Sequence, residues 1–427
     1  MTWRERLGAL RVDTSPLRES RDFRILFWAG TVFYLGGMIT YVALPYQLYR
    51  LTGSNFAVGA LGIVELVPLV VFGLYGGALA DHVDRRRMLV AMGATQAVLT
   101  ALLALNASLA EPRVWPIYVL GALLAAAQSM QRPSKEALEP RTVRHDQIMA
   151  ANALSSLGTQ VGLLAGPAVG GVLLAAFGAA WCFTVDVVAL IVATALFAAL
   201  RPYPVQDRSN PPSLRGIHEG LTYALRRRDL LGTYVVDMVA MLMAMPTVLF
   251  PALAADVFER PTMLGLLYSA GTVGSLLATV SSGWTKHVHH HGRAVVVAAA
   301  LWGAAVAVAG VMPDIWLLLL FLVLAGAADM ISGIFRATVW NQTIPDHMRG
   351  RLAGIEMLSY SVGPLGGQAR AGLVADAWSV RGSITSGGIL CVVGVVGTAV
   401  WLRDFWSYDA RTDEHARRER EIRAGGA

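Results

Sequence analysis

The sequence predicts an all-α membrane protein of twelve transmembrane helices arranged as two bundles of six. Of the 427 residues, 55% are hydrophobic and only 15% are charged, and the mean hydropathy is +0.53, so the chain has too little charge for an ordinary soluble protein. Apolar stretches of about 20 residues recur, which is the length a helix needs to cross the hydrocarbon layer with its backbone groups bonded internally. A polar, Pro-rich stretch in the middle separates two halves.

The twelve apolar windows are the elements on which this prediction rests. They run over 23–49, 57–80, 88–109, 115–138, 148–177, 181–200, 230–255, 263–285, 294–312, 315–340, 351–376 and 383–402. The predicted organisation is therefore an N-terminal arm (1–22), a first bundle (23–200), a central loop (201–229), a second bundle (230–402) and a C-terminal tail (403–427).

The distribution of arginine predicts the orientation, because Lys and Arg collect in short cytoplasmic loops. The arm carries five arginines and Arg24 follows shortly after it, whereas the predicted outer loops carry only Arg50, Arg113, Arg260 and Arg381. We therefore expect the arm, the central loop and the tail, and with them both termini, to be cytoplasmic. The net charge of +6 then reflects topology, and no nucleic-acid partner is expected, because the basic residues lie along one membrane face without base-stacking aromatics between them.

The turn between the second and third windows reads Gly77-Ala78-Leu79-Ala80-Asp81-His82-Val83-Asp84-Arg85-Arg86-Arg87. Its order of Gly, Asp and triple Arg resembles the loop between the second and third helices of major facilitator superfamily transporters. That resemblance implies the major facilitator fold, with two pseudo-symmetric six-helix bundles. His82 and Asp84 depart from the usual pattern of the superfamily.

The same resemblance implies a cytoplasmic gate formed by Gly77, Asp81, Arg85 and Arg86. In related carriers the Asp lies near the start of the eleventh helix, which here would be near 350–353, and a helix N-terminus favours a carboxylate. The arginines would reach Glu136 or Glu139 at the end of the fourth helix, so that the turn latches the two halves together. Alternatively, the arginines only fix the topology.

The second half repeats this turn in a degraded form, Gly283-Trp284-Thr285-Lys286-His287-Val288-His289-His290-His291-Gly292-Arg293. Three adjacent histidines could suggest a metal, but in a short loop they cannot easily close a tetrahedral site without carboxylate or thiolate help. We therefore expect a solvated loop, no metal and no cofactor. Cys182 and Cys391 lie inside predicted helices and predict no disulfide.

Glycines recur every four residues in the fifth window, which lays them along one face of a helix and lets a neighbouring backbone pack closely. Pro167 removes a backbone hydrogen bond there and permits a bend. The pattern resembles the fifth-helix motif of drug exporters within the superfamily, which implies a hinge at the interface of the two halves and export rather than import. Generic tight packing is the alternative. The hinge residues would be Gly158, Gly162, Gly166, Pro167, Gly170 and Gly171.

Three further segments resemble a bacterial exporter subgroup that includes macrolide-efflux and enterobactin-export proteins. They are residues 42–54, residues 249–254 and residues 350–354. The resemblance implies a multi-pass protein of the bacterial inner membrane.

Polar side chains inside the windows are candidates for coupling or substrate contact, because a charge at the bilayer centre costs about 2.5–3.5 kcal/mol and so faces a cavity or a partner. Glu65, flanked by apolar residues, is the first candidate for proton coupling, with a buried ion pair as the alternative. Asp237 and Asp329 follow, and Arg336 lies on the face of Asp329, about two helical turns on. Gln47 and Asn152 could donate hydrogen bonds to a substrate or merely join two helices.

The sequence thus predicts a proton-coupled secondary exporter that moves amphipathic or hydrophobic small molecules outward, a multidrug efflux antiporter conferring antibiotic resistance. Its partners would be the substrate, protons and the lipid bilayer, and we expect a monomer. No Gly-x-x-x-x-Gly-Lys-Ser/Thr loop for ATP is present, and neither are the Gly-x-Gly-Asp and His-Glu-x-x-His motifs of a membrane enzyme. The alternatives are a dedicated exporter of one metabolite, such as a siderophore, and a non-transporting receptor or scaffold.

Overall fold

The computed structural model of the chain describes residues 13–80, 83–203, 219 and 222–425. These residues are overwhelmingly helical and include no β-strand, which confirms the predicted all-α class. The chain divides into two compact units, one of Met1–Leu44 with Val71–Pro211 and the other of Pro45–Val70 with Pro212–Ala427.

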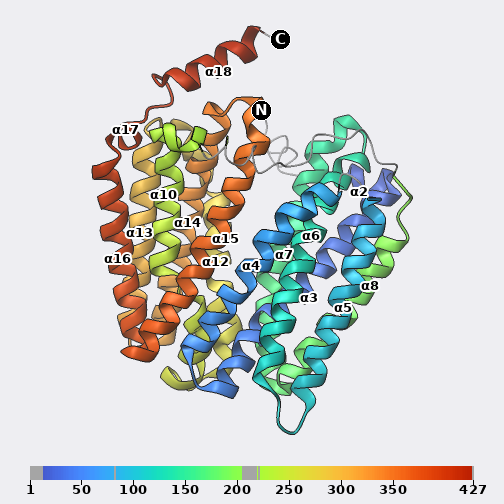
Figure 1. The fold of residues 1–427 in the computed structure, drawn as a ribbon. Coiled ribbons are helices and arrows are strands. Elements are labelled where there is room, and N and C mark those ends of the chain that lie inside the picture. Colours follow the sequence, from blue (N-terminus) through green and yellow to red (C-terminus); the bar gives the residue numbers. More distant parts are fainter. Residues whose placement is uncertain (1–12, 81–82, 204–218, 220–221, 426–427) are drawn as a thin grey trace, which may run out of the picture. The chain divides into compact units, whose positions relative to one another are not determined.

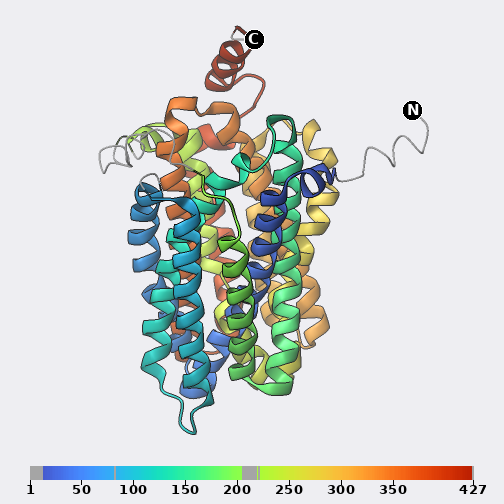
Figure 2. The same ribbon diagram turned by 90° about the vertical axis from the view of Figure 1, so that its right-hand side faces the viewer.

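The first unit is a bundle of long helices that run side by side (Figure 1). The loop joining α5 to α6 lies at the opposite end of this bundle from α2, as Figure 2 also shows. Its elements are α2 (Ser15–Glu19), the first part of α3 (Arg21–Thr52), the last part of α4 (Asn55–Ala80), α5 (Arg85–Ser108), α6 (Val114–Leu138), the short turns η1 (Glu139–Arg141) and η2 (His145–Gln147), α7 (Ile148–Phe177) and α8 (Ala179–Ala198).

The second unit contains the remaining helices, of which the first is interrupted. The elements are α10 (Arg228–Ala244), η3 (Thr247–Leu249), α11 (Phe250–Ala252), η4 (Leu253–Val257), η5 (Pro261–Met263), α12 (Leu264–Val280), η6 (Ser282–His287), α13 (His291–Val311), α14 (Ile315–Thr343), α15 (Asp346–Ala377), α16 (Val380–Trp401), α17 (Arg403–Trp406) and α18 (Glu414–Gly425). The sequence predicts one continuous seventh helix over 230–255, but α10 ends before Pro246 because a proline disfavours helical geometry at the preceding residue.

Helix ends in both units follow local chemistry. Asp84 accepts a hydrogen bond from the Arg87 backbone N–H at 3.1 Å and so caps α5. Asp314 caps α14 in the same way through the Trp316 N–H at 2.8 Å. Between α7 and α8 the chain turns at Gly178, whose φ of 82° is a left-handed conformation that favours glycine.

Ten helices of the described residues are long and apolar enough to cross a membrane. The other two predicted spans correspond to α6 and α15, which have 25 and 32 residues and are long enough by the helical rise of about 1.5 Å per residue. Polar residues in the second half of α6, among them Gln128, Arg132 and Lys135, lower its hydropathy. The described helices are thus consistent with twelve spans.

Residues 45–70 belong to the second unit, which differs from the predicted boundary between the bundles. The reason is a close packing of α4 on α15. A methyl group added at Gly59 would lie 2.6 Å from the Gln368 carbonyl oxygen, so only glycine allows this approach. At the end of α15, the Asp376 carboxylate caps the start of α4 by accepting bonds from the backbone N–H groups of Asn55 (2.8 Å) and Phe56 (3.0 Å).

Candidate functional site

Three predicted site residues come together in the second unit. Asp237 of α10 forms an ion pair with Arg336 of α14, and both side chains are buried, being 3% and 5% exposed. Asp329 lies two turns before Arg336 on α14, with its carboxylate 3.9 Å from the guanidinium and 40% of its side chain exposed. The ion pair is therefore buried, whereas the Asp329 side chain is partly exposed.

Ser359 of α15 completes the surroundings of Asp237. Its hydroxyl donates a hydrogen bond to the Asp237 carboxylate at 3.0 Å, and its side chain is 3% exposed. A buried carboxylate needs such partners, because an unpaired charge in an apolar interior is strongly destabilised. Asp237 is thus held by one residue from α14 and one from α15.

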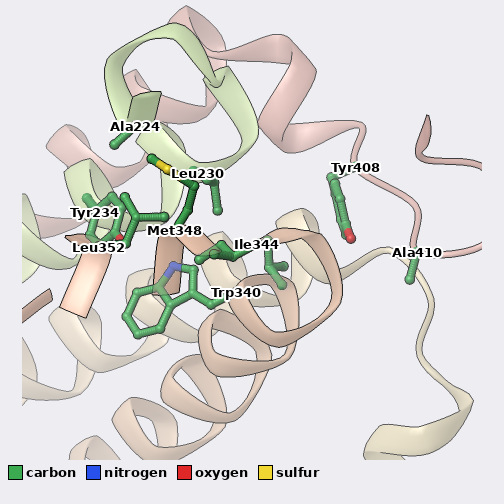
Figure 3. Close-up of a cluster of buried hydrophobic side chains, with 10 residues drawn as sticks. Ala224, Leu230, Tyr234, Trp340, Ile344, Met348, Leu352, Tyr408 and Ala410 are labelled. Atoms are coloured by element: carbon green, nitrogen blue, oxygen red, sulfur yellow. The ribbon is translucent and has the colours of Figure 1, made fainter. Parts of the chain in front are cut away.

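An aromatic pair supports the ion pair one turn away. Trp340, four residues after Arg336, stacks on Tyr234 with ring centroids 5.3 Å apart, and its indole N–H donates to the Thr233 hydroxyl at 2.8 Å. Figure 3 shows Tyr234 and Trp340 within a cluster of buried apolar side chains from α10, α14, α15 and the chain after α17. Because α10 and α14 are fixed against each other by this packing, Asp237 and Arg336 have little freedom to separate.

Two further candidates lie in the segment 45–70 of the same unit. Glu65 of α4 is half-buried, and no ion pair or hydrogen bond of its carboxylate occurs in the part of the chain that the structure describes. Gln47 of α3 is 6% exposed, and its amide oxygen has no hydrogen-bond donor among the described residues. Neither residue is part of the Asp237–Arg336 cluster. The alternative prediction, a buried ion pair of Glu65, has no partner residue in the described part of the chain.

Asn152 lies apart from the other candidates. It is in the first turns of α7 in the first unit and is exposed. No local sequence pattern predicts which side of the helix Asn152 occupies.

The arginines of the predicted gate bind helix ends in the first unit. Arg85 donates to the Ala137 carbonyl at 3.0 Å, and Arg86 donates to the Ala198 carbonyl, so they bind the last turns of α6 and α8. The last carbonyls of a helix lack intrahelical partners and attract cations. Gly77 lies in α4, whereas Asp81 lies outside the described residues.

Among the described residues, these arginines are not paired with the acidic residues of the fourth helix, and the latch stays a prediction. Glu136 instead pairs with Arg132 on its own helix at 2.7 Å, and Glu139 forms no ion pair with the arginine turn among the described residues. The carbonyls are nearer acceptors because the arginines begin α5 directly beside the ends of α6 and α8.

The glycines of the predicted hinge face α3 within the first unit. A methyl group at Gly162 would lie 2.7 Å from the Tyr34 Cβ atom, and one at Gly158 would lie 2.5 Å from the Thr31 hydroxyl. Gly166 and Gly170 face α3 in the same way, and Pro167 and Gly171 are also buried in α7. The partner of this stripe within the first unit is α3, and the hinge implied by the resemblance stays a prediction.

Asp186 is a further candidate carboxylate inside a predicted span, whereas the contacts of Asp376 and Lys135 were not predicted from the sequence. Asp186 of α8 is 2% exposed and accepts a hydrogen bond from the Thr40 hydroxyl at 2.5 Å. Asp376 caps α4. A third contact is the cation–π contact between Lys135 and Tyr34. The composition could have drawn attention to Lys135, because it is one of only two lysines among 35 Lys and Arg residues.

Also in the first unit, Tyr203 follows α8 and donates a hydrogen bond to Asp22 at 2.7 Å. Burial, together with this bond, raises the pKa of Tyr203 to about 12, so the phenol keeps its proton. In the degraded second turn, His290 approaches Asp409 at 3.6 Å, and the described residues contain no group of three or more side chains that could hold a metal.

Comparison with known proteins assigns a class to this arrangement. The model of a family described as transmembrane secretion effector matches residues 12–423. An enterobactin exporter of Citrobacter koseri is 28% identical over 393 residues, covering 90% of this chain and 93% of that protein. One of Escherichia coli is 26% identical over 389 residues with the same coverage.

Solved structures show the same fold at lower identity. A peptide transporter of the POT family matches with a TM-score of 0.73 and 13% identity, covering 95% of this chain and 99% of that one. The nucleoside transporter NupG matches with a TM-score of 0.69 and 12% identity, over 90% and 97% of the two chains.

Proposed function

Because the chain belongs to the transmembrane secretion effector family of major facilitator exporters, we propose that it exports a siderophore or a similar secreted metabolite. It is a transporter rather than an enzyme and a multi-pass protein of the inner membrane. The observation that carries the proposal is the match of 90% of the chain to proteins named as enterobactin exporters. The predicted alternative, a dedicated metabolite exporter, is thus better supported than broad drug efflux.

The chemistry of the second unit is in keeping with a polar substrate. Asp329 is partly exposed in α14, and its carboxylate oxygens offer hydrogen-bond acceptors. A purely hydrophobic drug would gain nothing from such groups, because burying polar groups without partners is unfavourable. A hydroxylated or ionised metabolite could satisfy them.

We further propose that transport uses the proton gradient, with Glu65 as the first candidate and Asp329 as the second. One charge crossing the membrane gains about 2.3 kcal/mol per 100 mV, and a tenfold gradient is worth about 1.4 kcal/mol. One proton per cycle can therefore maintain a steep outward gradient. The absence of a described partner for the Glu65 carboxylate supports its candidacy, since a paired carboxylate would hold its proton less readily.

Reconstitution tests the proposed function directly. Purified protein in proteoliposomes is given enterobactin or an amphipathic dye, and uptake into inside-out vesicles is measured with and without an imposed pH gradient. The proposal predicts gradient-driven accumulation of enterobactin that exceeds that of the dye. Accumulation of dyes and antibiotics without enterobactin would favour drug efflux, and no flux of any compound would favour a receptor or scaffold.

A deletion strain provides the matching test in cells. Loss of the protein is expected to lower the siderophore content of the medium and raise it in the cell, with drug susceptibility unchanged. Unchanged secretion together with greater susceptibility to many drugs would contradict the proposal.

A further inference from the structure

Lys135 is an unusual choice of residue for this chain. The sequence contains only two lysines among 35 Lys and Arg residues, and the other, Lys286, is exposed in η6. Lys135 is in the last turns of α6 and is half-buried. A residue needed only for topology or for reaching the membrane surface could be arginine, as nearly all the other basic residues are.

The Lys135 ammonium lies against one face of α3. Its Nζ atom is 4.9 Å from the centroid of the Tyr34 ring, a cation–π contact. One turn earlier, Gly30 leaves room for the ammonium, since a methyl group there would lie 2.7 Å from Nζ. The side chain therefore points at α3 rather than away from the bundle.

The glycine stripe of α7 positions Tyr34 from the other side. Gly162 lets α7 approach to within contact of the Tyr34 backbone and Cβ atom, which fixes where the ring stands. Phe33 meets Tyr34 edge-to-face at 5.9 Å. The ring is half-buried, and its hydroxyl makes no hydrogen bond among the described residues.

The acidic residues near this pair do not form an ion pair with the Lys135 ammonium in the described part of the chain. Arg132 and Glu136 of α6 pair with each other, and Glu139 at the helix end is the next acidic group. In the described part of the chain, neither carboxylate forms an ion pair with Lys135, and no hydrogen bond of its ammonium occurs. An ammonium has three donors, and one aromatic face satisfies only part of this requirement.

We propose that Lys135 and Tyr34 bind an aromatic ring of the exported molecule that carries an ionised hydroxyl, as a catecholate does. The ammonium and the phenol would donate to the ring oxygens, and the Tyr34 ring would contact the aromatic face. This inference rests on the proposed function and names a site for the substrate class among residues of the first unit. Lysine suits the role because its ammonium is a compact, strongly hydrated point charge that an oxygen anion can approach closely.

The presence of only two lysines allows a direct test of binding. The purified wild-type protein is treated with an amine-acetylating reagent, with and without enterobactin, and acetylation of the Lys135 and Lys286 peptides is measured by mass spectrometry. Enterobactin is expected to slow labelling of Lys135 about tenfold and to leave Lys286 unchanged. Equal labelling of Lys135 with and without enterobactin would overturn the site.

Substitutions supply the second readout, with Lys286→Met as the matched control. Lys135→Met is expected to raise the KM for enterobactin about tenfold, the effect of losing one charge-assisted hydrogen bond. Lys135→Arg should recover only part of the loss, because it keeps the charge but not the compact ammonium. Tyr34→Leu should raise KM more than Tyr34→Phe, which keeps the ring.

The outcomes separate this site from the proposed function. A wild-type protein that neither binds nor transports enterobactin would overturn both. A wild-type protein that transports it while Lys135→Met keeps the wild-type KM would overturn the site alone. Should Lys135→Met not fold, the labelling of the wild-type protein still decides.

Discussion

Asp237 of α10 and Arg336 of α14 form an ion pair whose side chains are at most 5% exposed. The pair joins the interrupted helix of the second unit to one of its longest helices. Ser359 supplies the additional hydrogen bond that a buried carboxylate requires. Such a pair can be structural, functional or both, and removal of one or both partners distinguishes these roles.

Breaking the pair on one side is expected to destabilise the protein strongly. Asp237→Leu leaves the Arg336 guanidinium buried without its carboxylate, at a cost of about 3–5 kcal/mol. The double variant Asp237→Leu/Arg336→Met removes both charges and should recover most of the stability. Thermal unfolding in detergent, followed by fluorescence, measures both variants.

Transport then distinguishes a structural from a functional pair. We expect the double variant to fold yet remain inactive in proteoliposomes, on the proposal that the two charges also act in transport. Full transport by the stable double variant would show that the pair is structural only.

The sequence was sufficient to predict the class and most helix positions. Windows such as 148–177 and 315–340 match α7 and α14 closely, because long apolar runs bounded by polar residues have one favourable arrangement in a bilayer. The position of Asp329 and Arg336 on the same face of one helix was also predicted, from their spacing of seven residues. The pairing of Arg336 with Asp237 of α10 could not be predicted, because no local pattern encodes which face of α10 meets α14.

The acceptors of the gate arginines also could not be predicted from the sequence. That Arg85 and Arg86 lie at a helix start followed from the turn, but their acceptors are carbonyls of α6 and α8. Any residue type offers a backbone carbonyl, so nothing in the sequence marks these acceptors. Acidic side chains can be read directly from the sequence, so the prediction was limited to them.

Asp376 is expected to hold the first turn of α4. Its carboxylate accepts bonds from the Asn55 and Phe56 N–H groups, and replacing such a cap by alanine costs about 0.5–2 kcal/mol. Asp376→Ala should therefore accelerate hydrogen exchange of these two amides. Asp314→Ala, which removes the cap of α14, is the matched control and should leave the α4 amides unchanged. Unaltered exchange at Asn55 and Phe56 in Asp376→Ala would show that the cap does not limit opening of α4.

Glu65→Gln is expected to uncouple transport from the pH gradient. The variant keeps the shape of the side chain but cannot exchange a proton, so downhill flux should persist while accumulation driven by one pH unit falls about tenfold for a one-proton cycle. Accumulation of substrate in proteoliposomes at several imposed gradients measures this effect. Asp329→Asn is the comparison, and if it alone abolishes the response to pH, the coupling residue is Asp329.

The glycine stripe of α7 predicts a contrast between two alanine substitutions. Gly162→Ala places a methyl group 2.7 Å from the Tyr34 Cβ atom, closer than real side chains approach, so α7 must move from α3. Overpacking of this kind costs about 1–3 kcal/mol. Gly37→Ala on α3 has nothing within 4 Å of the added methyl group, and replacing glycine in a helix should stabilise the protein by about 0.4–1 kcal/mol.

Thermal unfolding and enterobactin affinity together decide what the stripe does. Gly162→Ala is expected to lower the melting temperature and also to weaken enterobactin binding, because displacement of Tyr34 moves the ring away from Lys135. Gly37→Ala should do neither. A Gly162→Ala protein with reduced stability and unchanged affinity would show that the stripe serves packing without positioning Tyr34.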